Sequence, residues 1–230
     1  MLSNTLNILF DLDGTLTDPR EGITRCIQYA LGQFNEVIPP WEQLTWCIGP
    51  PLKASFAQLL NTGDPIMLDQ ALAHYRKRFS EKGLFENALY PGVASALDDL
   101  RTAGFKLFLA TSKPRVFARQ ILDHFKITPY FHTAYGSELD GRLSDKGVLI
   151  AHIIEKEGLD SSATLMVGDR VYDIEGGKKN NVMTAAVAYG YGTPDEINAA
   201  NPDVVFESIT DISQTLLFKS KWARGASQSQ

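Results

Sequence analysis

Short apolar runs rich in β-forming residues recur along the chain, and helical patterns lie between them. The runs cover residues 6–10, 106–111, 164–168, 184–189 and 204–206. Between them, apolar residues spaced three and four apart predict helices, as in 93–100, 117–125 and 148–154. Strands that alternate with helices are typical of a parallel sheet with helices on its faces. The pattern therefore predicts an α/β fold.

The spacing of the strands predicts a second, helical unit. About 90 residues separate the first two predicted strands, whereas a single crossover needs roughly a dozen to thirty. Helical patterns fill this stretch, and Asp64-Pro65 and Gly83 are typical of the beginning and end of one of its helices. We expect a helical domain at 18–90, able to close as a lid, inserted into a core of 1–17 and 91–218. Residues 219–230 are expected to form a polar, disordered tail.

Composition narrows the class of protein. The chain has 230 residues, 44% of them hydrophobic, which is enough for a sizeable core. The chain has 22 Lys and Arg and 27 Asp and Glu, and it has no block of basic residues. We therefore expect neither a nucleic-acid polymer nor a membrane as partner. Cys26 and Cys47 form no disulfide or zinc pattern. With no visible signal peptide or long apolar segment, we expect a cytoplasmic protein; the sequence predicts no oligomeric state.

The first predicted strand ends in two closely spaced carboxylates, Asp11 and Asp13, followed by Gly14 and Thr15. The period of a strand sends both carboxylates to one side before Gly14 permits a sharp turn. Two carboxylates this close repel each other unless a cation joins them, and Mg²⁺ suits such oxygen ligands. The alternative is a solvated Asp-Gly turn. A chance Asp-x-Asp-Gly-Thr is expected only about 0.003 times in such a chain, which favours the metal site.

Three further polar features follow later strands. Thr111 and Ser112 end the second strand, Lys146 lies in the first turn of a helix, and Asp169 and Asp173 follow the third long strand. Each alone has an ordinary alternative: a helix cap, a surface lysine and an acidic first turn. At the carboxyl edge of one parallel sheet, however, they would meet. Together they predict a metal and anion site suited to phosphoryl transfer.

These segments resemble the four motifs of the haloacid dehalogenase (HAD) superfamily, in the order of that family. The segments are Asp11 to Thr15, Thr111, Lys146, and Gly168-Asp169 through Asp173, and the resemblance covers about residues 7–217. Further stretches are similar to its phosphoglycolate phosphatase and bacterial 5′-nucleotidase-like branch: Gly83 to Asn87, Tyr90-Pro91-Gly92, Ala110 to Pro114, and Tyr189 to Gly192. The resemblance implies a Rossmann-like core with a helical (C1-type) cap inserted after the first strand.

The resemblance also implies a role for each motif residue. Asp11 would attack phosphorus and become an aspartyl-phosphate. Asp13 would protonate the leaving group and then deprotonate water. Asp11, the backbone carbonyl of Asp13, and Asp169 would bind Mg²⁺, with Asp173 in support. The phosphate-binding residues would be Asp11, Gly14, Thr111, Ser112 and Lys146. The implied activity is Mg²⁺-dependent hydrolysis of a small phosphomonoester such as phosphoglycolate or a nucleoside 5′-monophosphate.

Several related activities compete with this interpretation. A receiver-type signalling domain also uses an acceptor aspartate, a hydroxyl and a lysine, but its acceptor does not lie on the first strand. A dehalogenase acting on carbon resembles this fold but lacks the second acid, which is Asp13 here. A phosphomutase or other phosphotransferase of the β-phosphoglucomutase type keeps both acids and a cap. That alternative stays open.

Substrate choice is expected to depend on the cap. Gly49 belongs to a Gly-Pro-Pro turn that opens a helix and could place Lys53 over the site, and Arg20 could meet an anionic group. The alternatives are simple helix initiation and solvent exposure. Trp41, Trp46 and Tyr75 are interpreted as core residues of the cap rather than base-stacking residues.

Overall fold

The computed structural model describes residues 2, 5–34 and 36–227. The chain divides into two compact units, one formed by Met1–Leu16 with Leu89–Gln230 and the other by Thr17–Ala88. Within the described residues, no helix combines the length and apolar character that a membrane span requires.

The first unit contains a six-stranded sheet whose hydrogen-bonded neighbours all run parallel. Its order is β5 (Thr133–Ser137), β4 (Lys106–Pro114), β1 (Asn7–Phe10), β6 (Thr164–Gly168), β7 (Met183–Val187) and β8 (Val204–Phe206). The predicted α/β parallel fold is therefore confirmed. Strand β5 was not predicted from the sequence, because that segment has no continuous apolar run.

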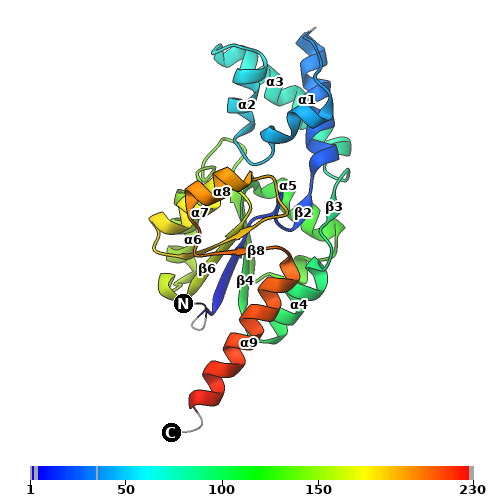
Figure 1. Ribbon diagram of the computed structural model, residues 1–230. Coiled ribbons are helices and arrows are strands. Elements are labelled where there is room, and N and C mark those ends of the chain that lie inside the picture. The colour runs from blue at the N-terminus through cyan, green and yellow to red at the C-terminus, as the bar shows by residue number, and fades with distance from the viewer. Residues whose placement is uncertain (1, 3–4, 35, 228–230) are drawn as a thin grey trace. The chain divides into compact units, whose positions relative to one another are not determined.

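Strand β1 lies at the centre of this sheet, between β4 and β6 (Figure 1). All four of its residues are buried, as expected of a strand covered on both faces. Its last residue, Phe10, pairs with Leu109 of β4 and Val167 of β6. The residues after these three strands therefore emerge next to one another at the carboxyl edge of the sheet, where open α/β sheets bind their ligands.

Helices surround the sheet: α4 (Val93–Thr102), α5 (Arg115–His124), α6 (Lys146–Glu157), α7 (Val171–Lys179), α8 (Pro194–Ala200) and α9 (Ile209–Ser227). Helix α6 packs Leu149, Ile150 and Ile153 against strand residues such as Leu9 and Phe108 in one buried cluster. The Asp145 side chain caps its beginning, and left-handed Gly158 ends it.

Helix α9 runs into the segment 219–230, for which the sequence predicted a polar, disordered tail, and it ends at Ser227. The disorder of that segment stays a prediction. Residues 228–230 lie outside the described residues.

The second unit is helical, as the spacing of the strands predicted. It contains α1 (Arg20–Leu31), α2 (Leu52–Leu59), α3 (Pro65–Arg78), two 3-10 segments (Gly32–Phe34 and Trp41–Cys47) and a π-helical turn (Phe79–Gly83). The Asp64 side chain accepts a hydrogen bond from the Ile66 backbone and caps α3, with Pro65 in the first turn. The segments that bound this unit, β2 (Thr17–Asp18) and β3 (Ala88–Leu89), pair as a two-stranded sheet.

The aromatic residues of this unit divide into two groups. Tyr75 is buried and its ring contacts those of Phe56 and Phe79, so its assignment to the core is confirmed. Trp41 and Trp46 are 42% and 37% exposed, so their assignment to the core was wrong. Both lie in the 3-10 segment Trp41–Cys47, in which Leu44 and Cys47 are the buried residues.

Candidate active site

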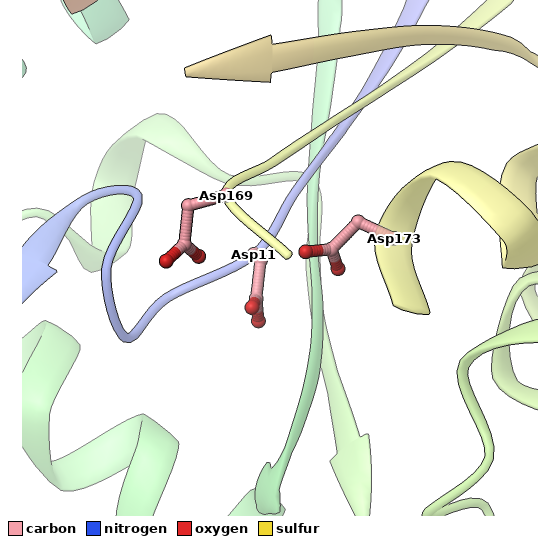
Figure 2. Close-up of side chains that lie close together, drawn as sticks. All are labelled: Asp11, Asp169 and Asp173. Atoms are coloured by element: carbon pink, nitrogen blue, oxygen red, sulfur yellow. The ribbon is translucent and has the colours of Figure 1, made fainter. Parts of the chain in front are cut away.

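Three carboxylates converge at the carboxyl edge of the parallel sheet. Asp11 follows β1, Asp169 follows β6, and Asp173 lies in the first turn of α7. All three are buried, and one oxygen of each lies within 4.8 Å of the others. Figure 2 shows the three side chains pointing toward one another from these separate segments. The geometry is that of a site able to hold a cation.

Lys146 joins two of these carboxylates from the first turn of α6. Its Nζ lies 3.1 Å from Asp11 Oδ1 and 2.8 Å from Asp173 Oδ1, and it donates to the carbonyl oxygen of Ala110 at 2.8 Å. Only 3% of its side chain is exposed. Burial lowers the pKa of the ammonium, but the two carboxylates outweigh this effect and raise it above its ordinary value. Lys146 is therefore a fixed, buried cation, not the surface lysine that sequence reasoning left open.

The Asp169 carboxylate is held by two hydrogen bonds and by the close approach of two glycines. Its Oδ2 accepts a hydrogen bond from the Tyr191 backbone at 2.8 Å, and its Oδ1 accepts one from Thr15 Oγ1 at 3.2 Å. Gly14 and Gly190 approach so closely that a Cβ on either would collide with the Asp169 side chain. Gly14 also has a φ of +86°, a conformation that favours glycine. These contacts fix the orientation of the carboxylate.

The charges of the site match a divalent metal. Four carboxylates lie here with two ammonium groups, a formal surplus of two negative charges; the groups are those of Asp11, Asp13, Asp169, Asp173, Lys113 and Lys146. Burial, with repulsion from neighbouring carboxylates, raises the pKa of Asp169 well above its ordinary value. A hard divalent cation with oxygen ligands would remove this repulsion. The residues present therefore fit such an ion.

The side chain of Asp13 lies beside this cluster and pairs with a residue that the sequence analysis did not assign. Its Oδ2 lies 2.5 Å from Lys113 Nζ. Its Oδ1 is buried and has no hydrogen-bond partner among the described residues. Burial raises the pKa of Asp13 even though Lys113 acts in the opposite direction. A signal for Lys113 was present in the sequence, since it comes two residues after Thr111 at the end of a strand.

The hydroxyls of Thr111 and Ser112 have different surroundings. Thr111 is buried, and its Oγ1 accepts a hydrogen bond from the Lys113 backbone at 3.2 Å. Ser112 Oγ donates to the Ser144 carbonyl at 3.1 Å. The alternative role of Ser112 as a helix cap was wrong, because β4 continues to Pro114, and Pro114 occupies the N-cap position of α5.

The residues predicted to choose the substrate belong to the helical unit, 17–88. Gly49 has a φ of +105°, which its turn requires. Lys53 Nζ lies 2.5 Å from Asp69, and Arg20 lies 3.3 Å from Asp18 with its guanidinium 5.1 Å from the ring centre of Trp41. These contacts are internal to that unit, and a role in substrate choice stays a prediction.

Comparison with known proteins identifies the family of this chain. A family model described as haloacid dehalogenase-like hydrolase matches residues 8–187. A 5′-nucleotidase of Pseudomonas aeruginosa is 44% identical over 210 residues, covering 91% of this chain and 95% of that protein. The tyrosine-protein kinase PtkA of Mycobacterium tuberculosis is 34% identical, and the match covers 88% of this chain and 69% of that kinase. A phosphoglycolate phosphatase of Caulobacter vibrioides is 29% identical, and the match covers 93% of this chain and 92% of that phosphatase.

A solved structure agrees with these relatives. The crystal structure of a predicted phosphatase from Clostridium acetobutylicum superimposes with a TM-score of 0.88 at 41% identity and covers 93% of this chain and 98% of its own. The family model spans far more than half of the 230 residues and includes every strand-end carboxylate described above. The chain therefore belongs to the haloacid dehalogenase-like hydrolases and is one of their phosphatases.

Proposed function

We propose that this chain hydrolyses small phosphomonoesters with the help of Mg²⁺, and that it does so through an aspartyl-phosphate on Asp11. The observation that carries the proposal is the position of Lys146 Nζ between Asp11 and Asp173, inside a cluster of three carboxylates. A nucleophile, a fixed cation and metal ligands are what phosphoryl transfer requires. The 44% identity to a 5′-nucleotidase makes nucleoside 5′-monophosphates the first substrates to test, with phosphoglycolate next.

In the proposed reaction, Asp11 is the nucleophile and Asp13 is the general acid and base. A carboxylate oxygen of Asp11 attacks phosphorus while the bond from phosphorus to the ester oxygen breaks, and Asp13 gives its proton to the departing oxygen. Water then attacks the aspartyl-phosphate, Asp13 takes the proton from that water, and the bond from phosphorus to Asp11 breaks. Inorganic phosphate leaves, and both side chains return to their first state.

The remaining residues bind and neutralise charge. Lys146 faces the phosphoryl group and balances Asp11, while Thr111, Ser112 and the backbone at Gly14 hold phosphoryl oxygens. Asp11, the Asp13 carbonyl and Asp169, with Asp173 in support, would hold Mg²⁺, which supplies charge neutralisation and orientation of those oxygens.

The helical unit is part of the same proposal. Residues 17–88 act as a cap in which Gly49, Lys53 and Arg20 contribute to substrate choice. The enzyme works in the cytoplasm, a placement supported by two buried cysteines, Cys26 and Cys47, that form no disulfide.

The test is phosphate release from nucleoside 5′-monophosphates, phosphoglycolate, sugar phosphates and p-nitrophenyl phosphate, measured in Mg²⁺ and in EDTA. We expect release that requires Mg²⁺ and is lost in Asp11→Asn, because an amide is not a nucleophile for this step. The matched control is Asp98→Asn, which changes an exposed carboxylate on α4 and should keep full activity. Steady hydrolysis by Asp11→Asn above background would contradict the proposed nucleophile.

A phosphotransferase is the second candidate, and one observation favours it. A relative at 34% identity is named a tyrosine-protein kinase. An aspartyl-phosphate can pass its phosphoryl group to a hydroxyl instead of water. In that case, phosphate should appear on an added sugar phosphate or tyrosine peptide with little inorganic phosphate released.

A further inference from the structure

We propose that Lys113 is a positioning residue for the hydrolysis. It holds one oxygen of Asp13 and thereby presents the other oxygen for proton transfer. This inference rests on the proposed function, because it assumes that Asp13 gives a proton to the leaving group. Lys113 is not one of the motif residues to which the family resemblance gives a role.

A bulge in β4 places Lys113 beside Asp13. The parallel register pairs Thr111 with Gly136, but the next pair joins Pro114 to Ser137. Two residues of β4, Ser112 and Lys113, therefore lie where β5 advances by a single step. Bulges of this kind redirect side chains and are common beside active sites.

The backbone of the bulge is fixed by its neighbours. Ser137 Oγ donates to the Ser112 carbonyl at 2.8 Å, and Ser112 Oγ donates to the Ser144 carbonyl at 3.1 Å. Gly136 passes so close that a Cβ there would lie 2.6 Å from the Lys113 carbonyl oxygen. The bulge therefore depends on glycine at 136, and the lysine extends from a rigid base.

The ion pair leaves the two oxygens of Asp13 in different states. Lys113 Nζ holds Oδ2 at 2.5 Å, and the two side chains are only 6% and 13% exposed. Oδ1 is buried and has no hydrogen-bond partner among the described residues. A buried carboxyl oxygen without a hydrogen-bond partner costs free energy, so its presence calls for a functional explanation. Oδ1 is thus the atom that carries the proton to the departing oxygen and later receives one from water.

The inference predicts a loss that depends on the leaving group. An alkoxide is a strong base and needs the proton, whereas p-nitrophenolate leaves without one. Misplacing a general acid costs on the order of 10- to 100-fold in rate. We expect Lys113→Met to lower kcat/KM by that factor for a nucleoside 5′-monophosphate and by less than about threefold for p-nitrophenyl phosphate. The parameter kcat/KM is used because it reports the steps up to departure of the leaving group.

The experiment compares both substrates for wild type, Lys113→Met and the matched control Arg119→Met, which removes an exposed cation from α5. A selective loss with the nucleotide supports the proposal. An equal loss with both substrates, or no loss, overturns it, because a merely structural or substrate-binding lysine does not distinguish leaving groups. Absence of phosphate release by wild type with either substrate would instead refute the proposed function itself.

A double variant tests whether Lys113 acts through Asp13. In an Asp13→Asn background, Lys113→Met is expected to change kcat/KM for the nucleotide by less than about twofold. A further loss as large as in wild type overturns the proposal. If Lys113→Met does not fold, Lys113→Arg replaces it, since arginine keeps the charge but alters the geometry. The same comparison of leaving groups then decides.

Discussion

Replacing Lys146 by methionine should destabilise the protein strongly when no divalent cation is present. The ammonium lies 3.1 Å and 2.8 Å from the oxygens of Asp11 and Asp173. At an effective dielectric constant of about 20, each contact contributes about 5 to 6 kcal/mol of Coulomb attraction. Loss of both is offset by several kcal/mol, because the buried ammonium no longer has to be desolvated. The expected net change in the free energy of unfolding is about 3 to 5 kcal/mol, typical of a buried pair that loses one partner.

The assay is urea unfolding followed by circular dichroism at neutral pH in EDTA. The matched control is Lys179→Met, which removes an exposed lysine from α7 and should change the free energy of unfolding by less than about 0.5 kcal/mol. Addition of Mg²⁺ is expected to reduce the deficit of Lys146→Met, because the metal compensates the same carboxylates. A Lys146→Met variant within about 1 kcal/mol of wild type in EDTA would refute the interpretation of Lys146 as the cation that balances this buried cluster.

Two further substitutions test other parts of the core. Gly14→Ala should weaken Mg²⁺ binding about 10- to 100-fold in a calorimetric titration, because the new Cβ would push the Asp169 carboxylate aside. The control is Gly104→Ala, since Gly104 has a similar φ of +95° but open space around it. Equal Mg²⁺ affinities of the two variants would contradict this reasoning. The hydroxyl of Tyr135 donates a hydrogen bond to Glu157 and lowers the pKa of that carboxyl. The contribution of this hydrogen bond to stability is therefore present above about pH 4.5 and is lost as the pH falls through the lowered pKa. Glu157→Gln should therefore cost about 1 kcal/mol at pH 7 and less at pH 3.5 in urea unfolding. A cost independent of pH would argue against a hydrogen bond to the ionised carboxylate.

The sequence alone predicted the features that depend on local periodicity. Strand β1 is a short apolar run because both of its faces are covered, and helix α6 carries its cap and its terminal glycine in the sequence itself. The motif residues follow strands, so the parallel topology brings Asp11, Asp169 and Lys146 together at one edge. The helical insert was visible because the separation of the first two strands far exceeds one crossover.

Other features were decided only by the tertiary structure. Strand β5 has little apolar signal, and it forms because β4 offers it an edge with free hydrogen-bonding groups. Trp41 and Trp46 were assigned to the core because they are apolar, but in their 3-10 segment the buried positions are taken by Leu44 and Cys47. The ion pair between Lys113 and Asp13 joins residues 100 positions apart in the sequence. It depends on a bulge in β4 that no local sequence pattern predicts. Local sequence therefore predicted which residues gather at the carboxyl edge of the sheet. Packing decided which charged groups face one another, because that depends on strand register and on close approach between distant segments.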